Sequence, residues 1–370
     1  MTEAWAESAA FSVGVEEEVM ILDRETLALE PAVETLLAGT AGFELPGSLK
    51  TELFAAVVEL NTGVCSTASA ALANVRALRG AGIEVARSHG LELAAAGTHP
   101  FSRPEEQAIA ADERYRTFVE YAGTAARRQG CNGLHVHVGM PSAEAALHAL
   151  EGVLPWLPVV LALSANSPYL SGEETTLAST RAEVLSLLPR RGAPPVFESW
   201  EGWERLVNRL VDSGLVRDYT AIWWDVRPHP RFGTLEIRMP DQPTAVELTG
   251  AFTALLQALC AAALDAPAER ADPIERSVYD QNRWAAARFG PRAELVHPSR
   301  NGAAVPVPEL AAELLELVAP FADALGGREL LGPLDPARSE ADRQLEIGRS
   351  HGLEAVCADL VSRSIPSAAQ

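Results

Sequence analysis

Three segments far apart in the chain carry charged or imidazole side chains at every second position, and the alternate positions are mostly apolar. They are residues 14–18 (GVEEE), 133–139 (GLHVHVG) and 234–239 (TLEIRM). Successive side chains of a β-strand point to opposite faces, so each segment is expected to form a strand with one polar and one apolar face. The polar positions are Glu16 and Glu18, His135 and His137, and Glu236 and Arg238. If the three strands share one sheet, their polar faces form a concave floor.

The remaining segments indicate one more strand and several helices. Strands are expected over 11–22, about 55–62, 133–140 and 234–239, and helices over 66–89, 104–129, 143–157 and 199–214, with further helices from 244 onward. Gly80 and Gly82 are expected to interrupt the helix of 66–89. Strands and helices do not alternate regularly, which indicates an α+β fold with an antiparallel or mixed sheet. No repeat or linker is found, so residues 11–363 are predicted to form a single domain, between a frayed N-terminus at 1–10 and a C-terminal tail at 364–370.

Charge and composition exclude several classes of protein. Among 370 residues, 50 Asp and Glu outnumber 30 Lys and Arg, for a formal net charge of −20. Such a chain repels phosphate backbones and anionic lipid, so neither nucleic acid nor a membrane is an expected partner. Lys50 is the sole lysine and lies outside any glycine-rich loop, which excludes a P-loop. The 4 cysteines include no CxxC pair, and no signal sequence is recognised, so a reduced, cytoplasmic protein is expected.

The polar positions suit a divalent cation. Two carboxylates about 4 Å apart repel by roughly 4 kcal/mol at an effective dielectric of 20, so Glu16 and Glu18 require a cation between them. Carboxylates with an imidazole and no thiol describe a hard-cation site for Mg²⁺ or Mn²⁺, which would bridge the oxygens of a nucleotide. Glu59 adds a carboxylate from its own strand. Glu52, seven residues earlier, can join only if a bend or helical turn intervenes, because a continuous strand would place it on the opposite face.

Each motif also has a simpler interpretation. A lone run of three glutamates is more typical of a solvated strand face, and Glu236 with Arg238 is typical of a same-face ion pair. The pair of histidines two residues apart instead favours a ligand or polar site. The coincidence of three such strands in one chain favours the functional interpretation for all of them.

Arginine must supply the positive charge that lysine does not. Arg181, Arg227 and Arg238 can each clamp a phosphate or a substrate carboxylate through a planar fork. Any one of them is equally typical of a surface residue, although Arg227 and Arg238 flank the third polar strand. Trp223 and Trp224 are expected to pack in the core or at its rim.

Several motifs in a fixed order resemble a known family. They are GVEEE (14–18), ELFAAVVELNTGVC (52–65), AAGTHPF (95–101), GLHVHVG (133–139), ALSANSP (162–168), IWWDVRP (222–228), LEIR (235–238) and NRWAAARFG (282–290). Together they resemble the bacterial carboxylate-amine ligases, also called glutamate-cysteine ligase type 2. The resemblance covers residues 11 to 300 or so, and the C-terminal helices are less diagnostic.

The resemblance implies a glutamine synthetase-like catalytic domain, in which a curved antiparallel sheet holds metal ions and ATP on its concave face and helices pack on its outer face. The metal-binding residues it implies are Glu16, Glu18, Glu52, Glu59 and Glu236, with His135 as a further metal ligand or nucleotide contact. Catalytic roles are expected for Glu236, Arg238 and Arg181, the two arginines as phosphate or acyl-phosphate contacts. Cofactor contacts are expected from His135, His137, Arg227 and Arg238.

The implied reaction forms an amide. ATP first phosphorylates a carboxylate, and the amine of a second substrate then displaces phosphate, with Mg²⁺, or Mn²⁺ in its place, offsetting the negative charge. Glutamate and cysteine are the default substrates, and the expected partners are therefore a small-molecule carboxylate and a small-molecule amine, both amino acids. A homo-oligomer is compatible with the family.

Two alternatives stay open. One is a zinc-dependent hydrolase built on the His135 and His137 pair, which would need further ligands. The other is a non-catalytic homologue that binds nucleotide without consuming it.

Overall fold

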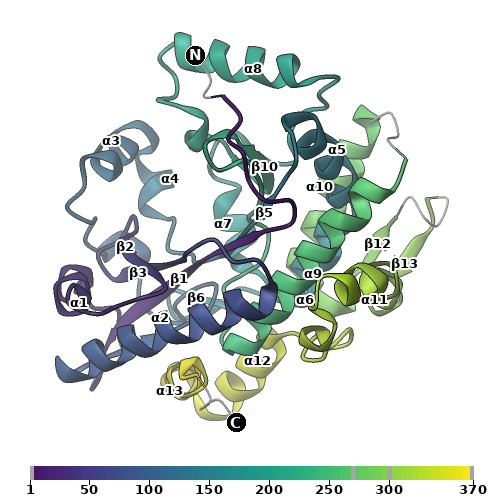
Figure 1. Cartoon of the computed structure of the whole chain (residues 1–370). Helices are drawn as coiled ribbons and strands as arrows, with labels where there is room; N and C mark the ends of the chain where they lie inside the picture. Colours follow the sequence, from purple (N-terminus) through teal and green to yellow (C-terminus); the bar gives the residue numbers. More distant parts are fainter. Residues whose placement is uncertain (1–3, 268–271, 298–301, 367–370) are drawn as a thin grey trace.

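The architecture is set by a seven-stranded sheet in which every pairing is antiparallel (Figure 1). The computed structural model describes residues 4–267, 272–297 and 302–366. The strand order is β10-β11-β5-β1-β3-β2, and β4 pairs with β1 off this path. The strands are β1 (Val13–Asp23), β2 (Gly47–Thr51), β3 (Val57–Thr62), β4 (Leu91–Ala94), β5 (Leu134–Gly139), β10 (Val226–His229) and β11 (Thr234–Ile237). The four predicted strands are confirmed, and the fold is α+β with an antiparallel sheet.

Strand β1 is the centre of this sheet. Along one side its residues 16–20 pair with β3, and along the other side residues 13–17 pair with β5 and residues 20–23 with β4. The long alternating run of apolar and polar residues in β1 explains this, because a strand of 11 residues can serve three partners. Polar side chains from neighbouring strands are therefore brought opposite one another on one face.

Helices cover the apolar face of the sheet. Helices α2 (Ala68–Ser88), α5 (Ala143–Val153) and α9 (Val246–Asp265) are among those that contact its strands directly. Alternate residues of β1, β5 and β11, such as Val15, Val136 and Ile237, are buried in this core at 1% exposure or less. The opposite face of the sheet is left to the polar side chains.

Helix α2 is continuous, so the predicted interruption at Gly80 and Gly82 is wrong. Thr67 caps its N-terminus by accepting a hydrogen bond from the backbone N–H of Ala70. A β-carbon at Gly82 would lie 3.0 Å from Leu93 of strand β4. The glycine therefore serves a close helix-to-sheet approach, and the cost of glycine within a helix is offset by this packing.

The single helix expected over 104–129 is also wrong. The structure has a short 3₁₀ turn at Pro104–Glu106, helix α3 (Glu113–Ala122) and helix α4 (Thr124–Arg127). Asp112 starts α3 by accepting a hydrogen bond from the N–H of Arg114, and Gly123 ends it with a φ of 56°. The intervening segment pairs Ile109 with Phe54, which draws it away from a helical path.

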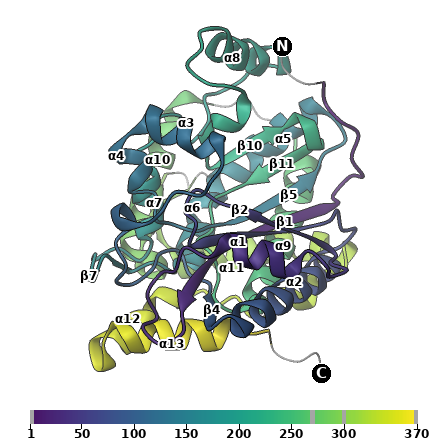
Figure 2. The same cartoon turned by 90° about the vertical axis from the view of Figure 1, so that its left-hand side faces the viewer.

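The remaining helices complete the outer layers. They are α1 (Val33–Thr40), α6 (Leu157–Ser164), α7 (Thr180–Leu185), α8 (Trp200–Asp212), α10 (Pro273–Phe289), α11 (Val307–Ala324), α12 (Glu340–His351) and α13 (Leu353–Ser364). Helix α8 lies at one end of the molecule beside the N-terminal segment, and α12 and α13 lie at the opposite end (Figures 1 and 2). Ser199 caps α8, and Trp203 and Val207 form the buried face of this helix.

Short two-stranded pairings lie outside the main sheet. They are β6 (Tyr169–Leu170) with β7 (Glu173–Glu174), β8 (Arg191–Gly192) with β9 (Trp223–Trp224), and β12 (Glu294–Val296) with β13 (Ala304–Pro306). Residues 4–10, before β1, contact the body of the protein: Ala6 N–H donates to Pro230 O, and Ser8 Oγ donates to Gly233 O. The division into one domain with short tails stays a prediction.

Two stretches are long and apolar enough to cross a membrane by length and composition alone. They are residues Ala143–Ser164 and Val246–Asp265, and 78% and 89% of their apolar windows are buried inside the protein. Core helices of soluble proteins pass the same test, so these stretches are weak evidence for a membrane span.

Candidate active site

Polar side chains form a continuous row across the sheet, because the register places them directly opposite one another. Glu18 faces Glu59, Glu16 faces His135, and His137 faces Glu236. Arg227 on β10 extends the row beyond Glu236. The sequence analysis predicted one shared polar face, and the structure brings all of these residues together on it.

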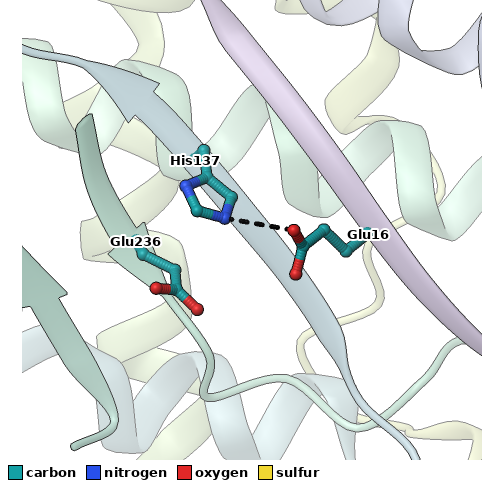
Figure 3. Close-up of side chains that lie close together, drawn as sticks. All are labelled: Glu16, His137 and Glu236. Atoms are coloured by element: carbon teal, nitrogen blue, oxygen red, sulfur yellow. Dashed lines mark ion pairs between the residues drawn. The ribbon is translucent and has the colours of Figure 1, made fainter. Parts of the chain in front are cut away.

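One group in this row consists of Glu16, His137 and Glu236, from strands β1, β5 and β11 (Figure 3). One potential ligand atom from each lies within 4.8 Å of the other two. His137 Nδ1 lies 3.0 Å from Thr234 Oγ1, and its Nε2 lies 3.6 Å from Glu16 Oε1. In the described part of the chain this buried Nε2 has no hydrogen-bond partner. Two carboxylates and a bare imidazole nitrogen form a donor set that fits a divalent cation.

The charges of this group are strongly coupled. Burial alone would raise the pKa of Glu16, but its hydrogen bond with His135 and the nearby His137 hold that pKa well below its usual range. Burial alone would lower the pKa of His137, but Glu16 and Glu236 raise it. Burial likewise opposes ionisation of Glu236, whose pKa is held well below its usual range by Arg227 and Arg238. Glu16 and Glu236 are thus ionised at neutral pH, as metal ligands must be.

A second group consists of Glu18, Glu52 and Glu59, again with one oxygen of each within 4.8 Å of the others. Burial and the charge of Glu18 raise the pKa of Glu52 to about 7, and burial with Glu16 and Glu52 raises that of Glu59. Three carboxylates held this closely repel one another, and a bound cation would relieve that repulsion. The donor set, all oxygen, fits Mg²⁺ or Mn²⁺.

Glu52 joins this group because the chain bends. Strand β2 ends at Thr51, and a turn at residues 53–56 separates it from β3. The bend that the sequence analysis required is therefore present. Tyr115 of α3 adds support, since its hydroxyl donates to Thr51 O at 2.8 Å and lies 3.4 Å from Glu52 Oε2.

His135 lies between the two groups. Its Nδ1 is 3.2 Å from Glu16 Oε2, and its Nε2 is 3.8 Å from Glu18 Oε1. Burial and the nearby charge of Arg238 lower its pKa, which favours the neutral imidazole that can bind a metal or a nucleotide. Its predicted role as a ligand or nucleotide contact is compatible with this place and stays a prediction.

The three predicted arginines have different surroundings. Arg227 is buried and donates to both oxygens of Glu236, at 2.6 and 3.2 Å, and to backbone carbonyls of Thr220 and Ile222. Arg238 also binds Glu236 and lies at the cleft. Arg181 lines the cleft too, with two donors on the carbonyls of Met239 and Arg238 and, in the described residues, no partner at Nε.

A cleft of about 910 Å³ opens over the second group. Its polar side includes Glu18, Glu52, His135, Arg181 and Arg238. Its outer wall is aromatic, from Tyr115, Phe118 and Tyr121 of α3 and from Trp223 and Trp224. Five of the predicted site residues are not among the lining residues: Arg227, His137, Glu16, Glu59 and Glu236. The predicted contacts of Arg227 and His137 with a nucleotide are therefore not supported by this placement and stay predictions.

Sequence reasoning missed two kinds of residue at this site. The aromatic side chains of α3 were read only as part of a long helix, and the two tryptophans only as packing; both tryptophans also line the cleft. Asn61 and Gln242 were missed as well, although Asn61 lies two residues after Glu59 on the same strand face. That spacing of two was the signal that could have identified it.

Comparisons with known proteins agree with this geometry. Residues 12–352 match the family described as Glutamate-cysteine ligase family 2. A Rubrobacter xylanophilus protein named "Putative glutamate--cysteine ligase 2-3" is 43% identical over 341 residues, covering 91% of this chain and 92% of that protein. A Sorangium cellulosum protein named "Putative glutamate--cysteine ligase 2" is 38% identical, covering 96% of each chain.

Solved structures show the same fold at much lower identity. A glutamate-cysteine ligase from Francisella tularensis, in complex with AMP, superposes with a TM-score of 0.72 at 13% identity, covering 98% of this chain and 89% of that one. A bifunctional glutathione synthetase from Pasteurella multocida gives 0.67 at 16% identity, covering 96% of this chain and 52% of that one. The family match and the close relatives, which both span nearly the whole chain, show that this protein belongs to the glutamate-cysteine ligase family 2.

Proposed function

We propose that this protein uses ATP to join the side-chain carboxylate of L-glutamate to the amine of L-cysteine, giving γ-glutamylcysteine, ADP and phosphate. The observation that carries the proposal is the row of six acids and imidazoles on one face of the sheet, of which Glu18 and His135, together with the neighbouring Glu52, line a cleft of about 910 Å³. A carboxylate is a poor acyl donor, so it must be activated, and phosphorylation by ATP does this. The names of close relatives support glutamate and cysteine as substrates.

The residues of the polar row and those of the cleft have different roles. Glu16, His137 and Glu236 would hold one Mg²⁺ and Glu18, Glu52 and Glu59 another; when bound, these ions would neutralise phosphate charge and let two anions approach. Arg238 and Arg181 lie where their guanidinium groups can face a phosphate. The aromatic wall formed with α3 excludes water from an acyl phosphate, which water would otherwise hydrolyse.

Neither alternative from the sequence gains support. A zinc-dependent hydrolase would use His135 and His137 together, but His135 Nδ1 lies beside Glu16 and the second group holds carboxylates alone. Family membership points to a ligase as well. A non-catalytic homologue would bind nucleotide without releasing ADP, and the assay below separates it from an enzyme.

The test is product formation. The protein is incubated with ATP, Mg²⁺ and pairs of amino acids, and ADP release is measured together with a mass-spectrometric search for an amide. ADP and phosphate should appear only when an acid and an amine are both present. ADP release without any amide, or silence across a wide panel of acids and amines, would contradict the proposal.

Glutamine variants test the two candidate metal groups. Glu16→Gln, Glu59→Gln and Glu236→Gln should each reduce kcat at least 100-fold, since each removes a charge from a metal ligand. Glu173→Gln, at an exposed position of β7, is the matched control and should keep full activity. Circular dichroism of each variant should remain that of the parent.

We also propose a cytoplasmic location, with ATP and amino acids as its small-molecule partners. The described cysteines, Cys65, Cys131, Cys260 and Cys357, are all free thiols, which supports a reducing compartment. The oligomeric state stays a prediction, and light scattering of the purified protein measures it.

A further inference from the structure

The sole lysine of the chain lies at the edge of the proposed metal site. Lys50 is on β2, the edge strand, directly opposite Glu59 of β3. The other basic positions, 29 of the 30 Lys and Arg, are all arginine. A chain that uses arginine everywhere else and lysine here indicates a position where the two side chains are not equivalent.

Hydrogen bonds connect Lys50 to the second carboxylate group. Its ammonium Nζ donates to Asn61 Oδ1 at 2.7 Å, and Asn61 Nδ2 donates to Glu59 Oε1 at 2.7 Å. An ammonium can only donate, so its contact fixes which end of the Asn61 amide points toward Glu59. Asn61 is also buried and lies directly opposite Glu16 of β1 in the sheet. It therefore lies between the candidate metal group that contains Glu16 and the one that contains Glu59.

The group of Glu16, His137 and Glu236 shows what happens when a basic side chain contacts a carboxylate directly. There Arg227 and Arg238 both donate to Glu236, and each of its two oxygens accepts at least one of these hydrogen bonds. At Glu59 the ammonium of Lys50 does not contact the carboxylate, because the neutral amide of Asn61 lies between the two side chains. Among the described residues, the hydrogen bond from Asn61 falls on Oε1 of Glu59 and none falls on Oε2. Glu59 therefore keeps an oxygen for a ligand while the positive charge stays nearby.

We propose that Lys50 is a positioning residue for the second carboxylate group, which acts through Asn61 to aim Glu59 at a divalent cation. The inference rests on the proposed function only in assuming that this group binds a cation. Arginine is not equivalent at this position, because its planar fork with five donors would not hold the Asn61 amide in the orientation that the compact ammonium does.

The experiment measures Mn²⁺ binding to the full chain by electron paramagnetic resonance, without nucleotide or amino acids. Lys50→Met should raise the Kd for Mn²⁺ about tenfold or more, the usual effect of removing a residue that orients a metal ligand. Lys50→Arg should weaken binding as well. Arg24→Met is the matched control: it removes the same charge from an exposed ion pair with Glu92 and should leave the Kd within twofold.

A double-mutant cycle tests the route through Asn61. Asn61→Ala should weaken Mn²⁺ binding, and Lys50→Met added to it should have no further effect, because the two residues act in one chain of hydrogen bonds. Parent-like binding in Lys50→Met or in Lys50→Arg, or additive effects in the double variant, would overturn the proposal. If Asn61→Ala does not fold, the comparison of Lys50→Met with Arg24→Met decides alone, since both side chains are exposed.

The two proposals can fail separately. If the parent protein binds Mn²⁺ and the variants behave as expected, but no amide is formed from any pair of substrates, the ligase proposal fails and the role of Lys50 stands. If amide is formed and Lys50→Met binds Mn²⁺ like the parent, the role of Lys50 is wrong and the ligase proposal stands.

Discussion

At the scale of single residues, three consecutive glutamates have different surroundings. Glu16 and Glu18 face the cleft side of the sheet, as their spacing predicted, while Glu17 points into the apolar layer and is fully buried. Arg79 of α2 donates to both of its oxygens, at 2.6 and 2.7 Å, and Thr249 and Gln242 donate to Oε1. Gln242 Oε1 in turn accepts the backbone N–H of Glu18. The buried pair thus ties α2 and α9 to the strand that carries the site.

Breaking this buried pair should destabilise the fold. Arg79→Met leaves an uncompensated carboxylate in the core, so the free energy of unfolding should fall by about 3–5 kcal/mol. Urea denaturation followed by circular dichroism measures it. Arg24→Met, which breaks an exposed pair, should change it by less than about 1 kcal/mol. Equal effects of the two variants would show that the buried pair is not special.

The raised pKa of Glu52, about 7 against an ordinary 4.5, predicts a pH dependence of stability. The folded, metal-free protein holds this proton more tightly than the unfolded chain, so between about pH 4.5 and 7 stability should fall as the pH rises. Glu52→Gln removes the titrating group and should make the fall shallower. Thermal melts in a chelator at several pH values measure this, and saturating Mg²⁺, which favours the ionised form, should remove the fall in the parent.

The sequence predicted the placement of candidate residues on regular strands better than that of residues elsewhere. Glu16, Glu18, His135, His137, Glu59 and Glu236 follow from strand alternation alone, because the period of two fixes the face of each side chain. Glu52 could be placed only conditionally, since its position depends on a turn. Glu17 and Arg79 could not be paired, because no local pattern tells which helix residue reaches a given strand.

At the scale of elements, Gly133, the residue before β5, lies against two side chains of the site, Glu18 and Arg181. The backbone N–H of Gly133 donates to Glu18 Oε2 at 2.5 Å. A β-carbon at Gly133 would overlap the guanidinium of Arg181, which is buried and held by two backbone carbonyls. The glycine is therefore needed for the close approach of Arg181 to this turn of chain.

Gly133→Ala should displace Arg181 from the cleft. Overpacking of this kind costs about 1–3 kcal/mol, and the displaced arginine should raise the KM for ATP or for the acid substrate. ADP release at varied substrate concentration measures the KM, and a thermal melt measures the stability. Gly80→Ala is the control, because nothing lies within 4 Å of the added carbon and alanine favours a helix. A parent-like KM in Gly133→Ala would contradict this account.

Element boundaries were predicted where local signals decide them. Ser199 and Thr67 accept capping hydrogen bonds as expected of helix starts. The prediction failed for 104–129 because the segment around Ile109 pairs with Phe54, a contact 55 residues away in sequence that no local pattern reveals. It failed at Gly80 and Gly82 because tertiary packing outweighs the low helix propensity of glycine.

At the scale of the whole molecule, the protein is an ATP-dependent carboxylate-amine ligase of the glutamate-cysteine ligase family 2, with a formal net charge of −20. The two carboxylate groups add to this excess of negative charge at one place. An antiparallel sheet with one polar face could be predicted from the sequence. The cleft wall could not, because α3 and residues 214–224 reach it from loops whose paths depend on the complete fold.

Mg²⁺ should therefore stabilise the entire chain. A ligand that binds only the folded state adds about 2.7 kcal/mol of stability at 100 times its Kd. The melting temperature should therefore rise when Mg²⁺ is added and fall back to the metal-free value when a chelator is added. Differential scanning calorimetry measures both steps. The double variant Glu18→Gln with Glu59→Gln should lose most of this rise, whereas Glu173→Gln should retain it.

Because the sole lysine lies on an edge strand, proteolysis at this residue can report local opening of the sheet. A lysine-specific protease can cut this chain at one peptide bond, after residue 50, in a strand that is paired on one side by β3. Cleavage there requires β2 to detach locally from β3. The rate at which the single cut appears therefore measures how often this edge strand opens. Slower cutting in the presence of Mn²⁺ would report, on a gel and without any enzymatic turnover, that the cation holds the strand in place.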